Sequence, residues 1–144
     1  MTELYYLLDV NVLLALSDRE HVSYGLASNW FAHIGKARFQ LCSTTESEFV
    51  RLAASPLLGN RNVNDAMALL RQFEEFPNCT YLPTDRPWQE LVAPFAHRLH
   101  GHRQVTDALL LGLAIASDSV LVTLDRHIEA LAGDEFQKNL LVLE

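Results

Sequence analysis

The chain has 144 residues, 49% of them hydrophobic, and a formal net charge of −7. This length and composition predict one compact domain over residues 1–144 with its own hydrophobic core. The negative charge weighs against a nucleic-acid partner, because such proteins usually carry a basic face. Four candidate metal-binding acids contribute to that charge, and −3 remains without them, so a nucleic-acid partner is not excluded.

Three features of the chain predict a cytoplasmic protein that does not span a membrane. Cys42 and Cys79 lie in apolar runs without the spacing of a zinc site, which favours free thiols in a reducing compartment. The longest apolar stretch, 108–116, is far shorter than the ~20 residues of a membrane span. The N-terminus lacks the basic lead and cleavage site of a signal peptide, and Asp9 interrupts its apolar run.

Apolar runs and helical periodicities alternate along the chain. In chain order they predict a strand at 4–8, helices at 11–16 and about 20–34, a strand at 39–43, helices at 45–54 and 62–76, a strand at 79–82, a helix at 87–99 that Pro94 bends or ends early, a buried helix at 105–117, a strand at 119–124, a short helix at 125–131 and a strand at 140–143. This alternation indicates an α/β fold, with a central, mainly parallel sheet of about five strands between two helical layers.

Two sequence patterns match the capping box, in which a hydroxyl residue precedes Glu by three positions. Ser17 with Glu20 is one, and Thr45 with Glu48 is the other. The second pairing leaves Glu46 free for another role. A rival pairing of Ser43 with Glu46 would make Glu46 structural, and spacing alone leaves both open.

Four acids, Asp9, Glu46, Asp107 and Asp125, each lie at a junction between an apolar run and a helix start. The carboxyl ends of parallel strands and the helix starts that follow them share one edge of the sheet. These acids can therefore meet in one cleft although the chain separates them widely. Like charges in one cleft repel and are costly to desolvate, which indicates a bound divalent cation.

Each acid also has a structural explanation. Asp9 and Asp125 are suited to cap the helices that follow them, and Asp107 gains from the dipole of its helix. Asn11 is a second polar group in an apolar segment, and buried without a partner it would cost roughly 1–3 kcal/mol. The hydroxyl of Thr123 is compatible with the same edge. The common placement of the four acids favours function over capping.

Basic residues near these acids are few. Arg98 and Arg103 flank a loop with His97, His100 and His102, and Arg51 lies one turn beyond Glu46. The histidine loop is read as solvated, because its glycine gives no fixed ligand geometry. The three arginines are weak candidates for contacts with RNA phosphates.

The segments LLDVNVLLAL, TTESEFVRL, VTDALLLGLA and LVTLDRHI resemble, in order, the acidic motifs of PIN-domain ribonucleases, and most of all the VapC toxins of toxin–antitoxin pairs. The resemblance covers nearly the whole chain and implies a three-layer PIN-like fold. It places the family's acids on Asp9, Glu46, Asp107 and Asp125, and its companion Asn on Asn11. Some PIN domains carry a further acid two residues past the last aspartate, where this chain has His127.

The resemblance implies a metal-dependent endoribonuclease that uses Mg²⁺ or Mn²⁺ to cleave RNA, with tRNA or rRNA as substrate. Asp9 and Asp107 would be the core ligands, with Glu46 and Asp125 completing the site. Asn11 and Thr123 would fix the geometry from behind. A VapB-like antitoxin and a homodimer are also implied.

Three other classes of protein are weighed against this hypothesis. A haloacid-dehalogenase-type phosphatase needs a second aspartate two residues after the first, and Asn11 occupies that position. A receiver-like domain needs paired early acids and a late lysine that the chain does not offer. A PIN-like module that binds RNA or protein without cutting it would not need all four acids.

Overall fold

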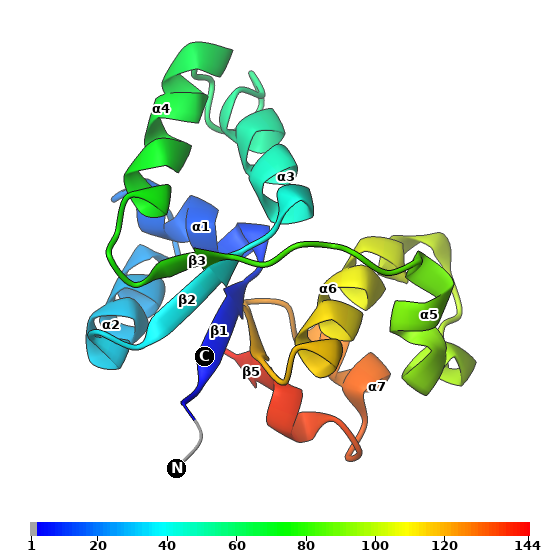
Figure 1. Cartoon of the computed structure of the whole chain (residues 1–144). Coiled ribbons are helices and arrows are strands. Elements are labelled where there is room, and N and C mark those ends of the chain that lie inside the picture. The colour runs from blue at the N-terminus through cyan, green and yellow to red at the C-terminus, as the bar shows by residue number, and fades with distance from the viewer. Residues whose placement is uncertain (1–2) are drawn as a thin grey trace.

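The computed structural model describes residues 3–144, which are built around a five-stranded parallel sheet. The strands are β1 (Tyr5–Leu8), β2 (Arg38–Leu41), β3 (Cys79–Tyr81), β4 (Val120–Thr123) and β5 (Leu140–Val142), in the order β3-β2-β1-β4-β5 (Figure 1). Every neighbouring pair of strands is parallel. The predicted α/β fold with a parallel sheet of five strands is confirmed.

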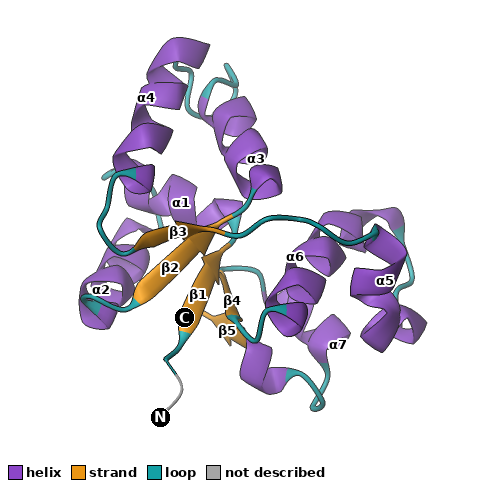
Figure 2. Cartoon of the chain, viewed as in Figure 1, coloured by secondary structure: helices purple, strands orange, loops and turns teal. Residues whose placement is uncertain are grey.

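Helices cover both faces of this sheet (Figure 2). One face carries α1 (Val10–Ser17), α2 (Tyr24–Ile34), α3 (Ser43–Ala53) and α4 (Val63–Glu74). The other carries α5 (Trp88–Val92), α6 (Val105–Ala116) and α7 (Glu129–Ala132), together with 3-10 turns at Ala93–Arg98, His102–Gln104, Arg126–Ile128 and Gln137–Asn139. The sheet and the helices on its two faces form the three layers of the fold.

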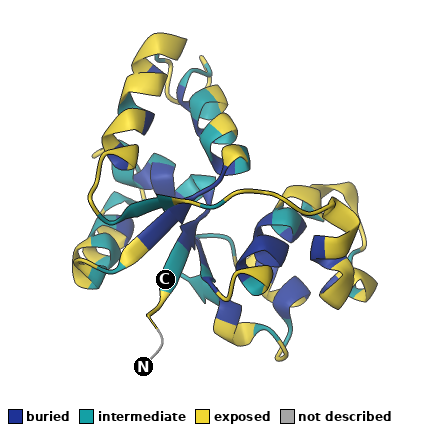
Figure 3. Cartoon of the chain, in the orientation of Figure 1, coloured by how far each residue is buried: buried dark blue, intermediate teal, exposed yellow. Residues whose placement is uncertain are grey.

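Much of the central strands and of α6 is buried (Figure 3). Side chains alternate along the strands and so supply two hydrophobic cores, one on each face of the sheet. Leu7 and Leu121 belong to the core under α5 and α6, whereas Leu8 and Val122 belong to the core under α1 to α4. All four are fully buried. Burial of each such side chain is worth roughly 1.5–3 kcal/mol. Both faces of the central strands are apolar, as expected for a parallel sheet between helical layers.

Helix α6 is the most deeply buried helix described, as its apolar sequence predicts. Gly112 lets α5 approach it closely, because a Cβ at this position would lie 2.6 Å from the carbonyl oxygen of Leu91. The first elements of this layer agree with the prediction that Pro94 ends the preceding helix early, because α5 ends at Val92 and a 3-10 turn that contains Pro94 follows it directly. This packing sets the position of the first turn of α6, where Asp107 lies.

Both predicted capping boxes are wrong. The hydroxyl of Ser17 donates to the carbonyl oxygen of Leu14 at 2.9 Å inside α1, and α2 begins only at Tyr24. Helix α3 begins at Ser43, two residues before Thr45, whose hydroxyl donates to the carbonyl oxygen of Leu8 at 3.2 Å. In both cases the hydroxyl donates a hydrogen bond to a backbone carbonyl oxygen, and this bond replaces the one that would cap a helix.

The predictions about membrane spans and about the cysteines can also be compared with the structure. Across residues 3–144 no helix is long and apolar enough to cross a membrane. Cys42 is a buried free thiol and Cys79 a half-buried one, as the sequence predicted.

Candidate functional site

Asp9 lies where β1 ends and α1 begins, and it is both a helix cap and a buried acid. Its Oδ1 accepts a hydrogen bond from the backbone N–H of Val10 at 2.7 Å. The residue is only 5% exposed. Burial raises the pKa of Asp9, the hydrogen bonds from Thr123 and Val10 oppose this, and the charge of Asp125 raises it further. The cap and the candidate functional acid are thus one residue.

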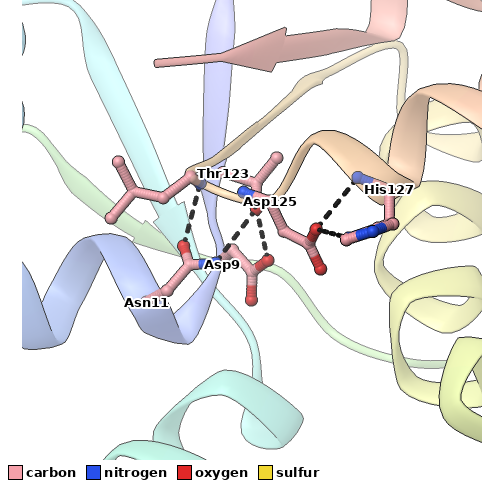
Figure 4. A network of polar contacts seen from close by, with 6 residues as sticks. Asp9, Asn11, Thr123, Asp125 and His127 are labelled. Atoms are coloured by element: carbon pink, nitrogen blue, oxygen red, sulfur yellow. Dashed lines mark hydrogen bonds and ion pairs between the residues drawn. The ribbon is translucent and has the colours of Figure 1, made fainter. Parts of the chain in front are cut away.

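Thr123, at the end of β4, links the polar residues around Asp9 (Figure 4). Its hydroxyl donates to Oδ2 of Asp9 at 2.7 Å. It also accepts from Nδ2 of Asn11 at 3.2 Å and from the backbone N–H of Asp125 at 3.0 Å. Oδ1 of Asn11 in turn accepts from the backbone N–H of Leu124 at 3.2 Å. The network joins the end of β1 to β4, since Thr123 bonds to Asp9 directly and Asn11 bonds to Thr123.

Asp125 caps the 3-10 turn that follows β4. Its Oδ1 accepts from the backbone N–H of His127 at 2.9 Å and lies 2.8 Å from Nδ1 of the same residue. Asp125 lies between Asp9 and His127 in the close-up (Figure 4). The carboxylate is half-buried and stands beside the network around Thr123.

Asp107 reaches the same place from the first turn of α6. Burial, and then the charges of Asp9 and Asp125, raise its pKa to about 6, while His127 opposes the shift. Asp9 and Asp125 therefore lie within electrostatic reach of Asp107, and Asp9 lines one hollow together with Asp107. The structure thus brings Asp9, Asp107 and Asp125 together from three separate segments of the chain.

The hollow that holds two of these aspartates has a volume of about 190 Å³. Asp9 and Asp107 line it together with Glu48, and the remaining lining residues are Val10, Thr44, Thr45, Thr106 and Leu110. Three threonines and three acids place hydroxyl and carboxylate groups in this hollow. It is suited to a charged, hydrogen-bonding ligand.

Glu46 does not lie in this hollow, although the sequence placed it there. It lines two neighbouring hollows between α3 and α4 together with Glu74. Burial and the hydrogen-bonded, like-charged Glu74 carboxyl raise the pKa of Glu46 to about 7. Helix α3 includes both Glu46 and Glu48, and residues two apart on a helix point about 200° away from each other. Only one of them can face Asp9, and in this structure it is Glu48.

The spacing of Glu46 and Glu48 shows that they point to different sides of a helix, but the sequence alone does not show which of them faces Asp9. Helical geometry says that only one of the two glutamates can face the aspartates. Choosing between them requires the start of α3, and the wrong capping box misplaced that start by two residues. Glu48 is also held by Arg51, whose Nη2 donates to its Oε2 at 2.8 Å.

The three arginines take different places. Arg98 is engaged by the end of α7, where its Nη1 donates to the carbonyl oxygens of Leu131 at 3.0 Å and Ala132 at 3.1 Å. Arg51 lies beside the hollow through its pairing with Glu48. Arg103 is exposed in the 3-10 turn that precedes α6. The structure therefore brings Arg51 to the site, and it gives Arg98 a structural contact.

The donor set of this site suits a hard divalent cation. Within residues 3–144 no three His, Cys, Asp or Glu side chains converge closely enough to form a complete protein cage for a metal. Mg²⁺ rarely uses such a cage, since it keeps several waters and binds through one or two carboxylates together with substrate phosphates. Asp9 and Asp107 offer carboxylate oxygens that repel each other, and a cation would relieve that repulsion. The residues present fit Mg²⁺ or Mn²⁺ on these grounds.

Comparison with known proteins agrees with this description. Residues 6–134 match the PIN domain family. Ribonuclease VapC44 from Mycobacterium tuberculosis is 38% identical over 128 residues, which are 85% of this chain and 87% of that protein. Ribonuclease VapC39 of the same organism is 31% identical over 83% of this chain and 87% of its own.

Solved structures share the fold at low sequence identity. The VapBC2 complex from Rickettsia felis, crystallised with a DNA fragment from its promoter, has a chain with a TM-score of 0.69 at 13% identity, covering 98% of this chain and 100% of that one. VapC20 from M. tuberculosis, a toxin that cleaves the sarcin–ricin loop, has a TM-score of 0.60 at 11% identity, over 79% of this chain and 84% of that one. The fold and the site define a PIN domain.

Within that class, the sequence match to the VapC relatives extends over most of each chain. The parallel sheet, its two helical layers and the aspartates at its carboxyl edge are those expected of a PIN domain. The chain belongs to the PIN-domain family and, within it, to the VapC family.

Proposed function

We propose that this protein is a metal-dependent endoribonuclease and the toxin of a toxin–antitoxin pair. The observation that carries the proposal is the convergence of Asp9, Asp107 and Asp125 at the carboxyl edge of the sheet, where the charges of Asp9 and Asp125 raise the pKa of Asp107 and the charge of Asp125 raises that of Asp9. A fold needs no such cluster for its stability, since like charges in a shared site are unfavourable. The names of the curated relatives, all ribonucleases, support the same activity.

The roles of the residues follow from their surroundings. Asp9 and Asp107 would hold the cation, and Glu48 is placed to orient a water in the same hollow. When bound, Mg²⁺ or Mn²⁺ supplies a more acidic water and polarises the phosphodiester. Thr123 and Asn11 keep the Asp9 carboxylate in place. The products would be a 5′-phosphate and a 3′-hydroxyl.

Loops of tRNA or rRNA are the substrates that we propose. Single-stranded loops can splay their bases and backbone into a shallow site, which a double helix cannot do. VapC20, which shares the fold, is a toxin that cleaves the sarcin–ricin loop. The two free thiols are consistent with action in the cytoplasm, where RNA of both kinds occurs.

A VapB-like antitoxin is the partner we propose, and the VapBC2 complex supports it. The groove between α3 and α4, with a volume of about 530 Å³, offers an apolar floor for such a partner. Val50, Met67 and Leu70 form that floor, and charged side chains form its rim. Leu13 is not available to such a partner because it is buried in the core, and Trp30 and Phe31 pack against that core. We also propose a homodimer, on the family resemblance alone.

The first test uses purified, antitoxin-free protein and a mixed pool of tRNA and rRNA, with Mg²⁺, with Mn²⁺ and with EDTA. Discrete fragments with 5′-phosphate ends are expected with either cation and not with EDTA. Asp9→Asn keeps the size of the side chain and its Oδ1 acceptor but removes the charge. It should reduce cleavage by at least about a hundredfold, since electrostatic groups of this kind often contribute that much.

Asp85→Asn is the matched control, because Asp85 is an exposed acid in the loop between β3 and α5 and does not line the hollow that holds Asp9 and Asp107. Its cleavage should equal that of the wild type. Fragments that persist in EDTA, or that survive in Asp9→Asn, would contradict the assignment. A wild type that binds the RNA pool without cutting it would favour a non-catalytic binding module.

A further inference from the structure

Two exposed aromatic side chains at the carboxyl edge of the sheet have no role in the proposed function. Among residues 3–144 the exposed aromatic residues are Phe76, Tyr81 and Trp88. The ring of Phe76 packs edge-on against Phe31 and Phe39, so contacts within the fold explain its position. Tyr81 and Trp88 are 58% and 37% exposed, and each is held by a polar atom at the start of a helix.

Tyr81 ends β3 and is held beside the start of α3. Its hydroxyl lies 2.7 Å from Oγ of Ser43, the first residue of α3. The next two residues, Thr44 and Thr45, line the hollow that also contains Asp9 and Asp107. The ring of Tyr81 is therefore fixed next to the wall that α3 gives to this hollow.

Trp88 begins α5 and is held beside the start of α6. Its indole Nε1 donates to the carbonyl oxygen of Val105 at 3.4 Å, and Val105 is the first residue of α6. The next two residues, Thr106 and Asp107, line the same hollow. Tyr81 and Trp88 thus contact the starts of the two helices that form its opposite walls.

The segment 82–87 connects the two aromatic residues. It runs from β3 across to α5 (Figure 1) and is exposed along nearly its whole length (Figure 3). The backbone N–H of Leu82 donates to the carbonyl oxygen of Leu41 at 2.8 Å, which fixes the first end of the segment to β2. The chain from Tyr81 to Trp88 can extend over at most about 25 Å. Both rings therefore serve one site.

Single-stranded RNA is bound by such exposed rings, because every base has a flat face that can stack on an aromatic side chain. Electrostatic attraction to the phosphates usually supplies much of the affinity. The net charge of −7 gives this chain little of that attraction. Contacts with the bases must then contribute more, and the hollow itself offers hydroxyl and carboxylate groups in place of aromatic faces.

We propose that Tyr81 and Trp88 stack on bases at the two sides of the scissile phosphate, so that the site selects single-stranded RNA. This inference rests on the proposed function, because it takes the hollow at Asp9 and Asp107 as the place of that phosphate. Ser43 and the carbonyl oxygen of Val105 orient the two rings. A double helix would not fit, since its bases already stack on each other and their faces are not available.

Fluorescence anisotropy with a short, labelled single-stranded RNA in Mg²⁺ tests the stacking. All proteins carry Asp9→Asn so that the RNA stays intact. Tyr81→Leu and Trp88→Leu keep an apolar side chain but remove the ring, and each should weaken binding by roughly 5–150-fold, the range for stacking of one base. Tyr81→Phe and Trp88→Phe keep a ring and should retain most of the affinity.

Three controls separate stacking from other effects. Phe76→Leu removes an exposed ring at the opposite edge of the sheet, and Asp85→Asn changes the segment between the two rings without removing either. Both should bind RNA as the Asp9→Asn parent does. An RNA of the same length without bases should bind weakly, and Tyr81→Leu and Trp88→Leu should weaken it no further. Equal losses with and without bases would overturn the inference, since the rings would then act through packing.

Tryptophan emission gives a second measurement that does not depend on affinity. Single-stranded RNA should quench the emission of the parent protein, and Trp88→Phe should remove most of this quenching. The remaining tryptophan, Trp30, packs against the core and the ring of Tyr6. Quenching that is unchanged in Trp88→Phe would contradict the position given to Trp88.

The outcomes distinguish this inference from the proposed function. If the wild type cleaves RNA while Tyr81→Leu and Trp88→Leu bind it as tightly as their parent, only the stacking is overturned. A wild type that neither binds nor cleaves RNA would contradict both proposals.

Discussion

Thr123 connects the residues of the site through one hydroxyl. That hydroxyl donates to Asp9 and accepts from Asn11 and from the backbone of Asp125, and the residue has no exposed surface. Thr123→Val keeps the shape but removes these bonds, so buried groups lose their partners at roughly 1–3 kcal/mol. The pKa of Asp9 should rise further, since the lost hydrogen bond is one of the contacts that lower it.

We expect Thr123→Val to lower the midpoint of urea unfolding and to reduce RNA cleavage by about 10–100-fold, the usual effect of removing a group that orients a metal ligand. Thr123→Ser is the control, because it keeps the hydroxyl and loses only a methyl group. If Thr123→Ser lost as much cleavage as Thr123→Val, the effect would come from packing and the network would have no part in it.

For single residues, the sequence correctly predicted the location of three of the four acids. Asp9, Asp107 and Asp125 each follow an abrupt end of an apolar run, and that signal depends only on the order of residues. Glu46 was misplaced because its orientation depends on the phase of a helix. An error of two residues in a helix start turns a side chain by about 200°, enough to exchange Glu46 and Glu48.

Between α3 and α4, the Glu46–Glu74 pair predicts a pH dependence of stability. Burial and Glu74 raise the pKa of Glu46 to about 7, above its ordinary 4.5. The folded state therefore keeps a proton that the unfolded chain releases between these values. The stabilisation is fully present below pH 4.5 and is lost as pH rises through about 7.

Glu46→Gln should remove this dependence and stabilise the protein above pH 7. Glu46 is only partly buried, so the gain after screening by solvent should be about 1 kcal/mol or less, or roughly 3 °C in Tm. Differential scanning calorimetry at pH 5 and pH 8 in EDTA measures it, with Glu75→Gln at the exposed end of α4 as control. A gain that is equal at both pH values would rule out the shared proton as its cause.

The elements themselves were predictable to the extent that they depend on apolar pattern. All five strands lie within or beside the predicted runs, because a buried parallel strand is a short, continuous apolar segment bounded by polar residues. Helix starts were less predictable. The hydroxyls of Ser17 and Thr45 bond to carbonyl oxygens, one of them in another element, and local sequence does not contain that information.

For the whole molecule, the site lowers the stability of the folded state, because it holds three like charges close together. Asp9, Asp107 and Asp125 come from the ends of β1 and β4 and the start of α6, so the fold itself brings the three charges together. Only the folded chain does this, and a cation that binds there must therefore stabilise the fold. At a free cation concentration of 100 times Kd, the stabilisation is about 2.7 kcal/mol.

That free energy corresponds to a rise of roughly 8 °C in Tm for a chain of this size. We expect the rise with Mn²⁺ relative to EDTA, at constant ionic strength, and a smaller one or none in Asp9→Asn. The Tm of Asp9→Asn in EDTA should also be closer to that of the cation-bound wild type, because one of the repelling charges is gone. Equal shifts in the two proteins would place the cation elsewhere on an acidic surface. No shift in the wild type would mean that the convergence of the aspartates serves something other than a metal.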